Sequence, residues 1–243
     1  MSQSVRRAAR IIDAIADESK SVAQLAKEFG LHRSTMFREL QSLEEVGYVR
    51  RRKDGKFTLG LRLITLSKKA VDGLDMRGAA HEHLMRLHKE VGDTIHLAAL
   101  MEHSIVYVDK VEDPNGVRMY SRIGNAVQPY CTGVGKAILA ELDTAERDEV
   151  LRGTTWERFT DTTLTSREML DRELDEVKER GWAVDDGEFE GFINCVAVPI
   201  VTAVGVVGAL SLTAIRMVRD LGDLKGDLPL LKRTAELIAR DLG

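Results

Sequence analysis

The sequence predicts an α+β protein in two parts: a small helical head closed by a β-hairpin, and a larger domain with a mainly antiparallel sheet. Three observations support this. Apolar residues recur at helical spacing near the amino terminus, a basic hairpin pattern follows, and strands alternate with flanking helices beyond it. At 243 residues the chain exceeds one average domain. We expect domains at residues 1–60 and 76–243, joined by a linker helix over 61–75.

Composition and charge narrow the function classes. With 44% hydrophobic and 30% charged residues, the chain has the composition of a globular protein. No apolar run reaches the roughly 18 residues that a membrane span requires, and residues 1–10 lack the apolar core of a secretion signal, which predicts a cytoplasmic protein. Residues 1–56 carry 12 Lys and Arg against 8 Asp and Glu, and the remainder carries 23 against 31. Because phosphates attract local positive charge, the basic head is the expected nucleic-acid side.

Three helices are predicted in the head. The second begins with a capping box from Ser21 to Gln24 and ends at Gly30, and the third ends at Gly47. The expected buried positions of the first helix, Val5 to Ala16, are Val5, Ala8, Ala9, Ile12, Ile15 and Ala16. Those of the second are Val22, Leu25, Ala26 and Phe29, and those of the third are Met36, Leu40, Leu43 and Val46.

The second and third helices match a helix-turn-helix. They are joined by a tight glycine turn, and the third displays small polar and cationic groups at its amino terminus, as a recognition helix in the major groove does. A basic hairpin follows, in which Asp54-Gly55 is a two-residue turn signal. Alone it would be a solvated charged ribbon, but beside a recognition helix its cations can lie along phosphates or in the minor groove. The candidate DNA-contacting residues are Ser21, His32, Arg33, Ser34, Thr35, Arg38, Arg50, Arg51, Arg52, Lys53 and Lys56.

The segment from Arg33 to Arg51, with Phe57 to Leu63 after it, resembles the DNA-binding region of the IclR family of transcriptional regulators. The resemblance continues in the stretches His96–Ala98, Val106–Val111, Cys131–Ala137 and Asn194–Ile200. It implies a winged helix-turn-helix joined to a GAF-like α+β effector-binding domain, assembled as dimers or tetramers. The residues that it implies contact the effector are Val127, Gly133, Val134, Asp185, Ile193, Cys195, Ser211 and Thr213. The chain departs from the family pattern at Gly187 and at Val127 to Tyr130, which leaves the specificity of the pocket open.

Further elements are predicted along the rest of the chain. A helix over Gly60–Leu74 has an apolar face that pairs with its twin in a dimer or packs against its own chain. A capping box from Thr165 to Glu168 opens a later helix that stops at Gly181. The other expected elements are a helix with Ala80, Leu84, Leu87 and Val91 buried, strands Thr94–Leu100, Ile105–Val111, Phe192–Ile200 and Gly205–Thr213, and a helix beyond Pro229.

Three stretches of the larger domain are expected to converge on a ligand. Residues Cys131–Ala137 open an apolar helix, whose free amides attract a carboxylate or phosphate. They do not form a nucleotide P-loop, because Tyr130 and Ala137 stand where that motif needs other residues. Strand alternation pairs Ile193 with Cys195 on one face, and Ser211 with Thr213. The plainer interpretation is a core cysteine, hydroxyls that satisfy backbone groups, and a solvated loop carboxylate at Asp185. Three aromatic residues either shape the pocket or belong to the core: Trp156, Phe159 and Trp182.

The preferred hypothesis is a homodimeric or homotetrameric repressor without catalytic residues, metal or cofactor. It binds a pseudo-palindromic operator in double-stranded DNA, and a small organic acid changes the spacing of its recognition helices through the Gly60–Leu74 helix. One alternative is a redox- or metal-sensing regulator that uses Cys131 and Cys195. Others are a cysteine-dependent enzyme with His96 or His103 as base, and a dimerising scaffold that does not bind DNA. The sequence names neither effector nor operator.

Overall fold

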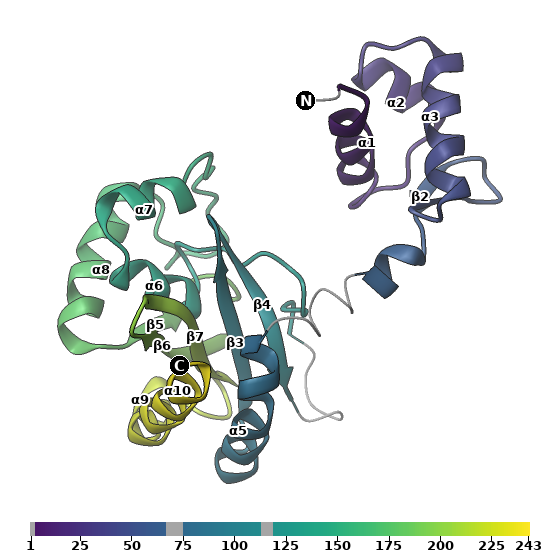
Figure 1. The fold of residues 1–243 in the computed structure, drawn as a ribbon. Helices are drawn as coiled ribbons and strands as arrows, with labels where there is room; N and C mark the ends of the chain where they lie inside the picture. The colour runs from purple at the N-terminus through teal and green to yellow at the C-terminus, as the bar shows by residue number, and fades with distance from the viewer. Residues whose placement is uncertain (1–2, 67–74, 113–118) are drawn as a thin grey trace. The chain divides into compact units, whose positions relative to one another are not determined.

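The computed structural model describes residues 3–66, 75–112 and 119–243. The chain divides into two compact units, Met1–Gly73 and Leu74–Gly243, which we call the head unit and the sheet unit (Figure 1). Within the described ranges, no helix is both long and apolar enough to cross a membrane. Of the helix expected over Gly60–Leu74, residues 62–66 are helical and residues 67–74 lie outside the described ranges.

The head unit packs three helices and a two-stranded hairpin around one apolar core. Its elements are α1 (Gln3–Ala14), α2 (Val22–Glu28), α3 (Arg33–Glu45), β1 (Val49–Arg51) and β2 (Phe57–Leu59). Ile11, which the periodicity missed, is fully buried beside Ile15, whereas Val5 is 68% exposed and Val46 is 47% exposed. Both of these predicted core residues lie near helix ends, beyond the reach of the neighbouring elements. The predictions for Ala9 and Ala16 are also wrong, since both are exposed.

The hairpin of β1 and β2 closes with a three-residue loop rather than the two-residue turn that the sequence predicted. Val49 pairs with Leu59 and Arg51 with Phe57. Arg52 N donates to Lys56 O at 2.8 Å, and Gly55 N donates to Arg52 O at 3.0 Å. Gly55 has a φ of +80°, the left-handed conformation that such loops require after a type I turn. The hairpin is tied to the helices because Phe57 N donates to Lys20 O at 2.8 Å.

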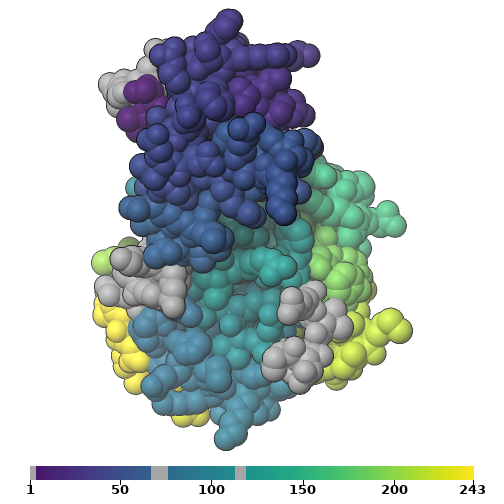
Figure 2. Space-filling model, turned by 90° about the vertical axis from the view of Figure 1, so that its right-hand side faces the viewer, coloured from purple at the N-terminus to yellow at the C-terminus, as the bar shows by residue number. Residues whose placement is uncertain are grey.

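The sheet unit is built on a five-stranded antiparallel sheet with the order β4-β3-β7-β6-β5. The strands are β3 (Thr94–Met101), β4 (Ser104–Val111), β5 (Ala183–Asp186), β6 (Ile193–Thr202) and β7 (Gly205–Ile215). Four of these were expected, and β5 was not. Figure 2 shows the face of this unit on which α5 (blue) and the region of edge strand β4 (teal) reach the surface.

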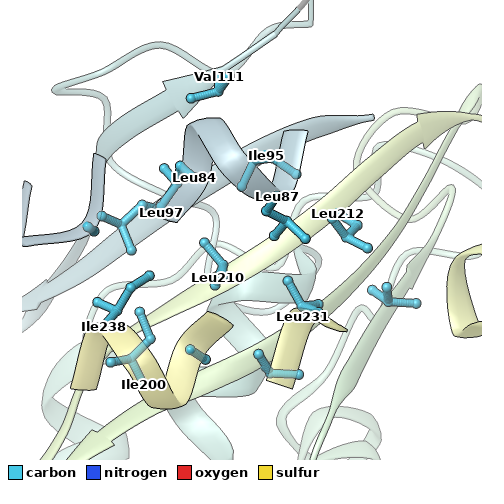
Figure 3. Close-up of a cluster of buried hydrophobic side chains, with 14 of the residues drawn as sticks. Leu84, Leu87, Ile95, Leu97, Val111, Ile200, Leu210, Leu212, Leu231 and Ile238 are labelled. Atoms are coloured by element: carbon cyan, nitrogen blue, oxygen red, sulfur yellow. The ribbon is translucent and has the colours of Figure 1, made fainter. Parts of the chain in front are cut away.

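Helices cover both faces of the sheet, which gives three layers (Figure 1). They are α5 (Asp75–Val91), α6 (Gly133–Glu141), α7 (Thr144–Val150), α8 (Arg167–Arg180), α9 (Leu221–Gly226) and α10 (Leu228–Leu242). One core lies between α5, α9, α10 and the sheet, where Leu84, Leu210 and Leu231 meet (Figure 3). The other lies between α6, α8 and the opposite face. The cap of α8 is Ser166, which accepts from Met169 N, so the capping box predicted at Thr165 is wrong.

Candidate nucleic-acid interface and ligand cavity

The amino terminus of α3 is a capped and exposed helix end. His32 has extended backbone angles and caps the helix, its imidazole accepting from Ser34 N. Its Nδ1 also lies 2.9 Å from Ser34 Oγ. Arg33, Ser34 and Arg38 are exposed, and Thr35 is half-buried. The predicted contact residues of α3 therefore share one accessible helix end.

Most cations of the head unit that were predicted to contact DNA are not used in internal ion pairs. Arg52 is the exception, because its guanidinium contacts Asp54 at 3.7 Å and donates to Ser19 Oγ at 3.2 Å. Ser21 is committed to the capping box of α2, where its Oγ accepts from Gln24 N. Within the described part of the chain, the cations without a carboxylate partner include Arg33, Arg38, Arg50, Arg51, Lys53 and Lys56. Their charge is available for an external anion such as a phosphate backbone.

A cavity of about 40 Å³ lies in the sheet unit, at the amino terminus of α6. Every residue that the sequence predicted to contact the effector lines it except Val127, which belongs to the core beneath α6. A buried water needs about 10–15 Å³ of such volume, so the cavity holds about three waters. A ligand with more than a few heavy atoms requires part of the lining to move. The lining residues are His96, Tyr107, Met119, Ser121, Thr132, Gly133, Val134, Asp185, Phe189, Glu190, Ile193, Cys195, Ser211 and Thr213.

The first turn of α6 is seated directly on β6. A Cβ atom at Gly133 would lie 2.8 Å from Cys195 Sγ and 3.2 Å from the Cβ of Ala197, so only glycine fits. Thr132 caps the helix, its Oγ1 donating to Gln128 O at 2.7 Å and accepting from Gly135 N. Amides in the first turn have no acceptor inside the helix, and Gly133 and Val134 of this turn line the cavity. This end of the cavity suits a carboxylate or another small anion.

Asp185 is a buried strand residue, not the solvated loop carboxylate of the plainer interpretation. It is 5% exposed on β5, directly opposite Cys195 in the sheet, and its Oδ1 accepts from Glu188 N at 2.7 Å. Burial, and next the negative charge of Glu188, raise the pKa of Asp185 to about 7. The carboxyl group can therefore accept or donate a hydrogen bond near neutral pH.

A buried ion pair joins α6 to the segment that follows β5, and both contribute other residues to the cavity lining. Lys136 on α6 is 1% exposed, and its Nζ lies 2.5 Å from Oε1 of Glu188, which follows β5. Glu173 on α8 is 3.8 Å from the same ammonium group. Burial raises the pKa of Glu188, and the charge of Lys136 opposes that rise. This pair therefore fixes the position of α6 relative to Glu188, whose backbone amide donates to Asp185.

His96 extends the polar lining across β3. It is buried, with Nδ1 3.1 Å from Thr213 Oγ1 and Nε2 2.7 Å from Ser121 Oγ. The ring of Tyr107 packs against it at 5.4 Å between centroids. Burial, and next the charge of Lys110, lower the pKa of His96 to about 3, so the imidazole is neutral.

Neither cysteine has the surroundings of a reactive thiolate. Burial raises the pKa of Cys195 to about 12 and also raises the pKa of Cys131, and Asp185 adds to both shifts. A thiol with a raised pKa is a poor nucleophile and a poor metal ligand. Among the described residues, no group of three or more His, Cys, Asp and Glu side chains is arranged to hold a metal ion.

The comparisons with known proteins agree with this architecture. Residues 4–53 match the family model of the IclR helix-turn-helix domain. Residues 68–240 match the model of the bacterial transcriptional regulator IclR C-terminal domain. The chain belongs to the IclR family. Members of this family are DNA-binding transcriptional regulators, so the head unit is the helix-turn-helix part of an IclR-family regulator.

Individual IclR-family relatives are similar over most of their length. KdgR of Escherichia coli K12 is 36% identical over 206 residues, covering 84% of this chain and 78% of KdgR. XynR of the same organism is 33% identical over 245 residues, covering 99% and 97%. The crystal structure of the Thermotoga maritima IclR superposes with a TM-score of 0.72 at 34% identity, covering 98% of each chain.

Sequence reasoning missed part of the lining of this IclR-family cavity. Ser121 and Glu190 lie outside regular elements, and no periodicity indicated either of them. His96 could have been found, because it lies in the stretch His96–Ala98 that resembles the family. Its position opposite Ser211, however, depends on the pairing of β3 with β7. Trp156 and Phe159 pack around Tyr130 in the core, and Trp182 lies against Arg180, so none of these aromatic rings lines the cavity.

Proposed function

We propose that this IclR-family regulator represses transcription from a pseudo-palindromic operator, and that a small organic acid bound in the cavity changes its operator affinity. The convergence of the α6 amides, Asp185, Cys195 and the two strand hydroxyls on one cavity carries the proposal. A relative named as a transcriptional repressor, AllR of Klebsiella pneumoniae, is 30% identical over 229 residues, covering 93% of this chain and 84% of AllR. Protonated thiols and a neutral imidazole support binding of a ligand without catalysis.

We propose that the regulator acts as a homodimer, since two recognition helices are needed to read two half-sites. Leu61 and Leu66 expose apolar side chains on and beside the helical residues 62–66. A groove next to them is lined by Val46, Gly47 and Arg62. Such exposed apolar surface on a small domain is typical of protein contacts, and a second copy of the chain is the partner we propose.

The proposal is tested with the full chain in two steps. Genomic fragments that bind in modest salt are selected against random competitor DNA, and purified protein is screened by thermal shift with small carboxylates. We expect a specific complex, and at least one acid that raises the melting temperature and changes the affinity for the selected fragment. Absence of any complex stronger than competitor, with or without the acids, contradicts the proposal.

Arg38→Ala is expected to lower operator affinity by about 5- to 150-fold, which corresponds to about 1–3 kcal/mol for a lost base contact. Arg38 is exposed on α3 and has no carboxylate partner within the described residues. Fluorescence anisotropy with the selected operator measures the effect. Arg172→Ala, which removes an exposed arginine of α8, is the matched control and should bind as the parent protein does. Equal affinities for both variants would show that Arg38 does not contribute to operator binding.

Arg51→Ala is expected to weaken binding to all sequences by a similar factor and to make the salt dependence shallower. Arg51 lies on β1 with its side chain exposed, where contact with phosphates carries no base information. Each lost phosphate contact lowers the slope of log affinity against log salt by about one. Titrations between 50 and 200 mM salt, on operator and on random DNA, give the slopes. An unchanged slope is the contrary result.

A further inference from the structure

One wall of the cavity is polar without being cationic. It combines His96 of β3 and Thr213 of β7 with Ser121, from the segment that precedes α6. Lys110, whose charge acts on His96, pairs with Glu112 at 2.6 Å and donates to Ser121 O at 3.3 Å. The wall therefore offers hydrogen bonds and no free positive charge to a ligand.

The neutral imidazole of His96 stands between two hydroxyl groups. One ring nitrogen carries a proton and the other a lone pair, so His96 donates to one hydroxyl and accepts from the other. Each hydroxyl has one donor and two acceptor sites, and the bond to His96 uses only one of these. Thr213 also bonds the Cys195 thiol, which leaves one unused site on its hydroxyl, and the unused capacity of Ser121 and Thr213 is available at the cavity that both residues line. Tyr107, packed on the ring, holds this arrangement in place.

Two acidic residues of the cavity lining favour a hydrogen-bond donor on the ligand. Asp185 and Glu190 both line the cavity, and the side chain of Glu190 accepts only from Tyr120 N, at 3.3 Å, among the described residues. An alkyl chain beside them would leave buried polar groups unpaired, and a second carboxylate would be repelled. A hydroxyl group both donates and accepts, and is neutral.

We propose that His96 and Ser121, with Thr213, form a second subsite that receives a hydroxyl group of the effector, so that the effector is a hydroxylated carboxylic acid. This rests on the proposed function, in which the acid group itself binds at the amino terminus of α6. The subsite discriminates between acids of the same length by the presence of the hydroxyl.

The test uses the full chain and matched pairs of acids, measured by isothermal titration calorimetry. The pairs are glycolate with acetate, glycerate with propanoate, threonate with butanoate, and gluconate with hexanoate. We expect at least one hydroxylated acid to bind ten times more tightly than its partner, because an analogue without the hydroxyl leaves the subsite unpaired. If the plain acids bind equally well, the inference is wrong while the proposed function stands. If no acid binds but the operator does, the inference and the organic-acid part of the proposed function both fail.

Variants separate a binding role from a structural one. Ser121→Ala and the isosteric Thr213→Val should lower the affinity for the preferred hydroxylated acid at least tenfold and leave the affinity for its plain partner unchanged. Thr144→Val, at an exposed position of α7, is the control and should change neither affinity. Equal losses for both acids in the Ser121 and Thr213 variants would show a merely structural role and overturn the inference. His96→Phe, which keeps a ring in place, should abolish the discrimination as well.

Discussion

Lys136→Met is expected to lower the free energy of unfolding of the sheet unit by about 3–5 kcal/mol, since it removes one partner of a buried ion pair. Lys136 is almost completely buried, and its partner Glu188 has one further oxygen, Oε2, without a hydrogen bond in the described chain. The substitution leaves a buried carboxylate without a counter-charge. Both tryptophans, Trp156 and Trp182, lie in the sheet unit, so denaturation at pH 8 followed by their fluorescence measures the loss.

A double variant supplies the control for this prediction. Lys136→Met with Glu188→Leu replaces the whole pair by apolar side chains, and such replacements are often close to neutral. We expect it to recover most of the stability that the single variant loses. The deficit of the single variant should also shrink as the pH falls and Glu188 takes up a proton. A double variant as unstable as the single one would show that packing of Lys136, not its charge, matters.

Asp185→Asn is expected to stabilise the free protein at pH 8, by at most about 4 kcal/mol. The folded-state pKa of Asp185 is about 7, against an ordinary value of 3.8. A pKa difference of one between the folded and unfolded states corresponds to about 1.36 kcal/mol of stability. Between about pH 4 and pH 7 the unfolded chain loses this proton while the folded chain keeps it. The folded state then binds more protons, so its stability falls as the pH rises through this window. Asparagine does not ionise, so the variant does not lose stability in this way, and its side-chain oxygen can still accept from Glu188 N.

Unfolding free energies at several pH values check this prediction. Wild type and Asp185→Asn should be similar near pH 4 and diverge up to about pH 7, after which the difference stays constant. Asp175→Asn, at an exposed position of α8, should follow the wild-type curve. A curve for Asp185→Asn that is parallel to the wild type across the whole range would show that Asp185 ionises normally in the folded protein.

The head unit was largely predictable because its signals are local. The capping box from Ser21 to Gln24 is present as expected, and α2 and α3 end just before Gly30 and Gly47, which have positive φ angles. Errors arose where a helix end meets solvent. Val46 fits the apolar period of α3, but it follows the last helical residue and nearly half of it is exposed. Periodicity identifies the apolar face of a helix, but it does not show how much of that face the neighbouring elements cover.

The cavity was less predictable, because it depends on strand register and on irregular segments. Alternation predicted a shared face for Ile193 and Cys195 and another for Ser211 and Thr213, and the strand register then sets Cys195 directly opposite Thr213 across β6 and β7. The strand at Asp185 was too short to be recognised, and its burial comes from pairing with β6. The contact between His96 and Ser121 joins residues 25 positions apart, and Ser121 lies outside any regular element. No local pattern encodes such a contact.

The absence of a side chain at Gly133 bears on attempts to make this cavity accept new ligands. Randomising that position would fail, since even a methyl group collides with Cys195 and Ala197. The segment after β5 is also a poor target, because Glu188 in it is paired with the buried Lys136 of α6. Met119 and Ser121 belong to neither framework, and a mutant library concentrated there should yield altered responses with the fewest misfolded clones.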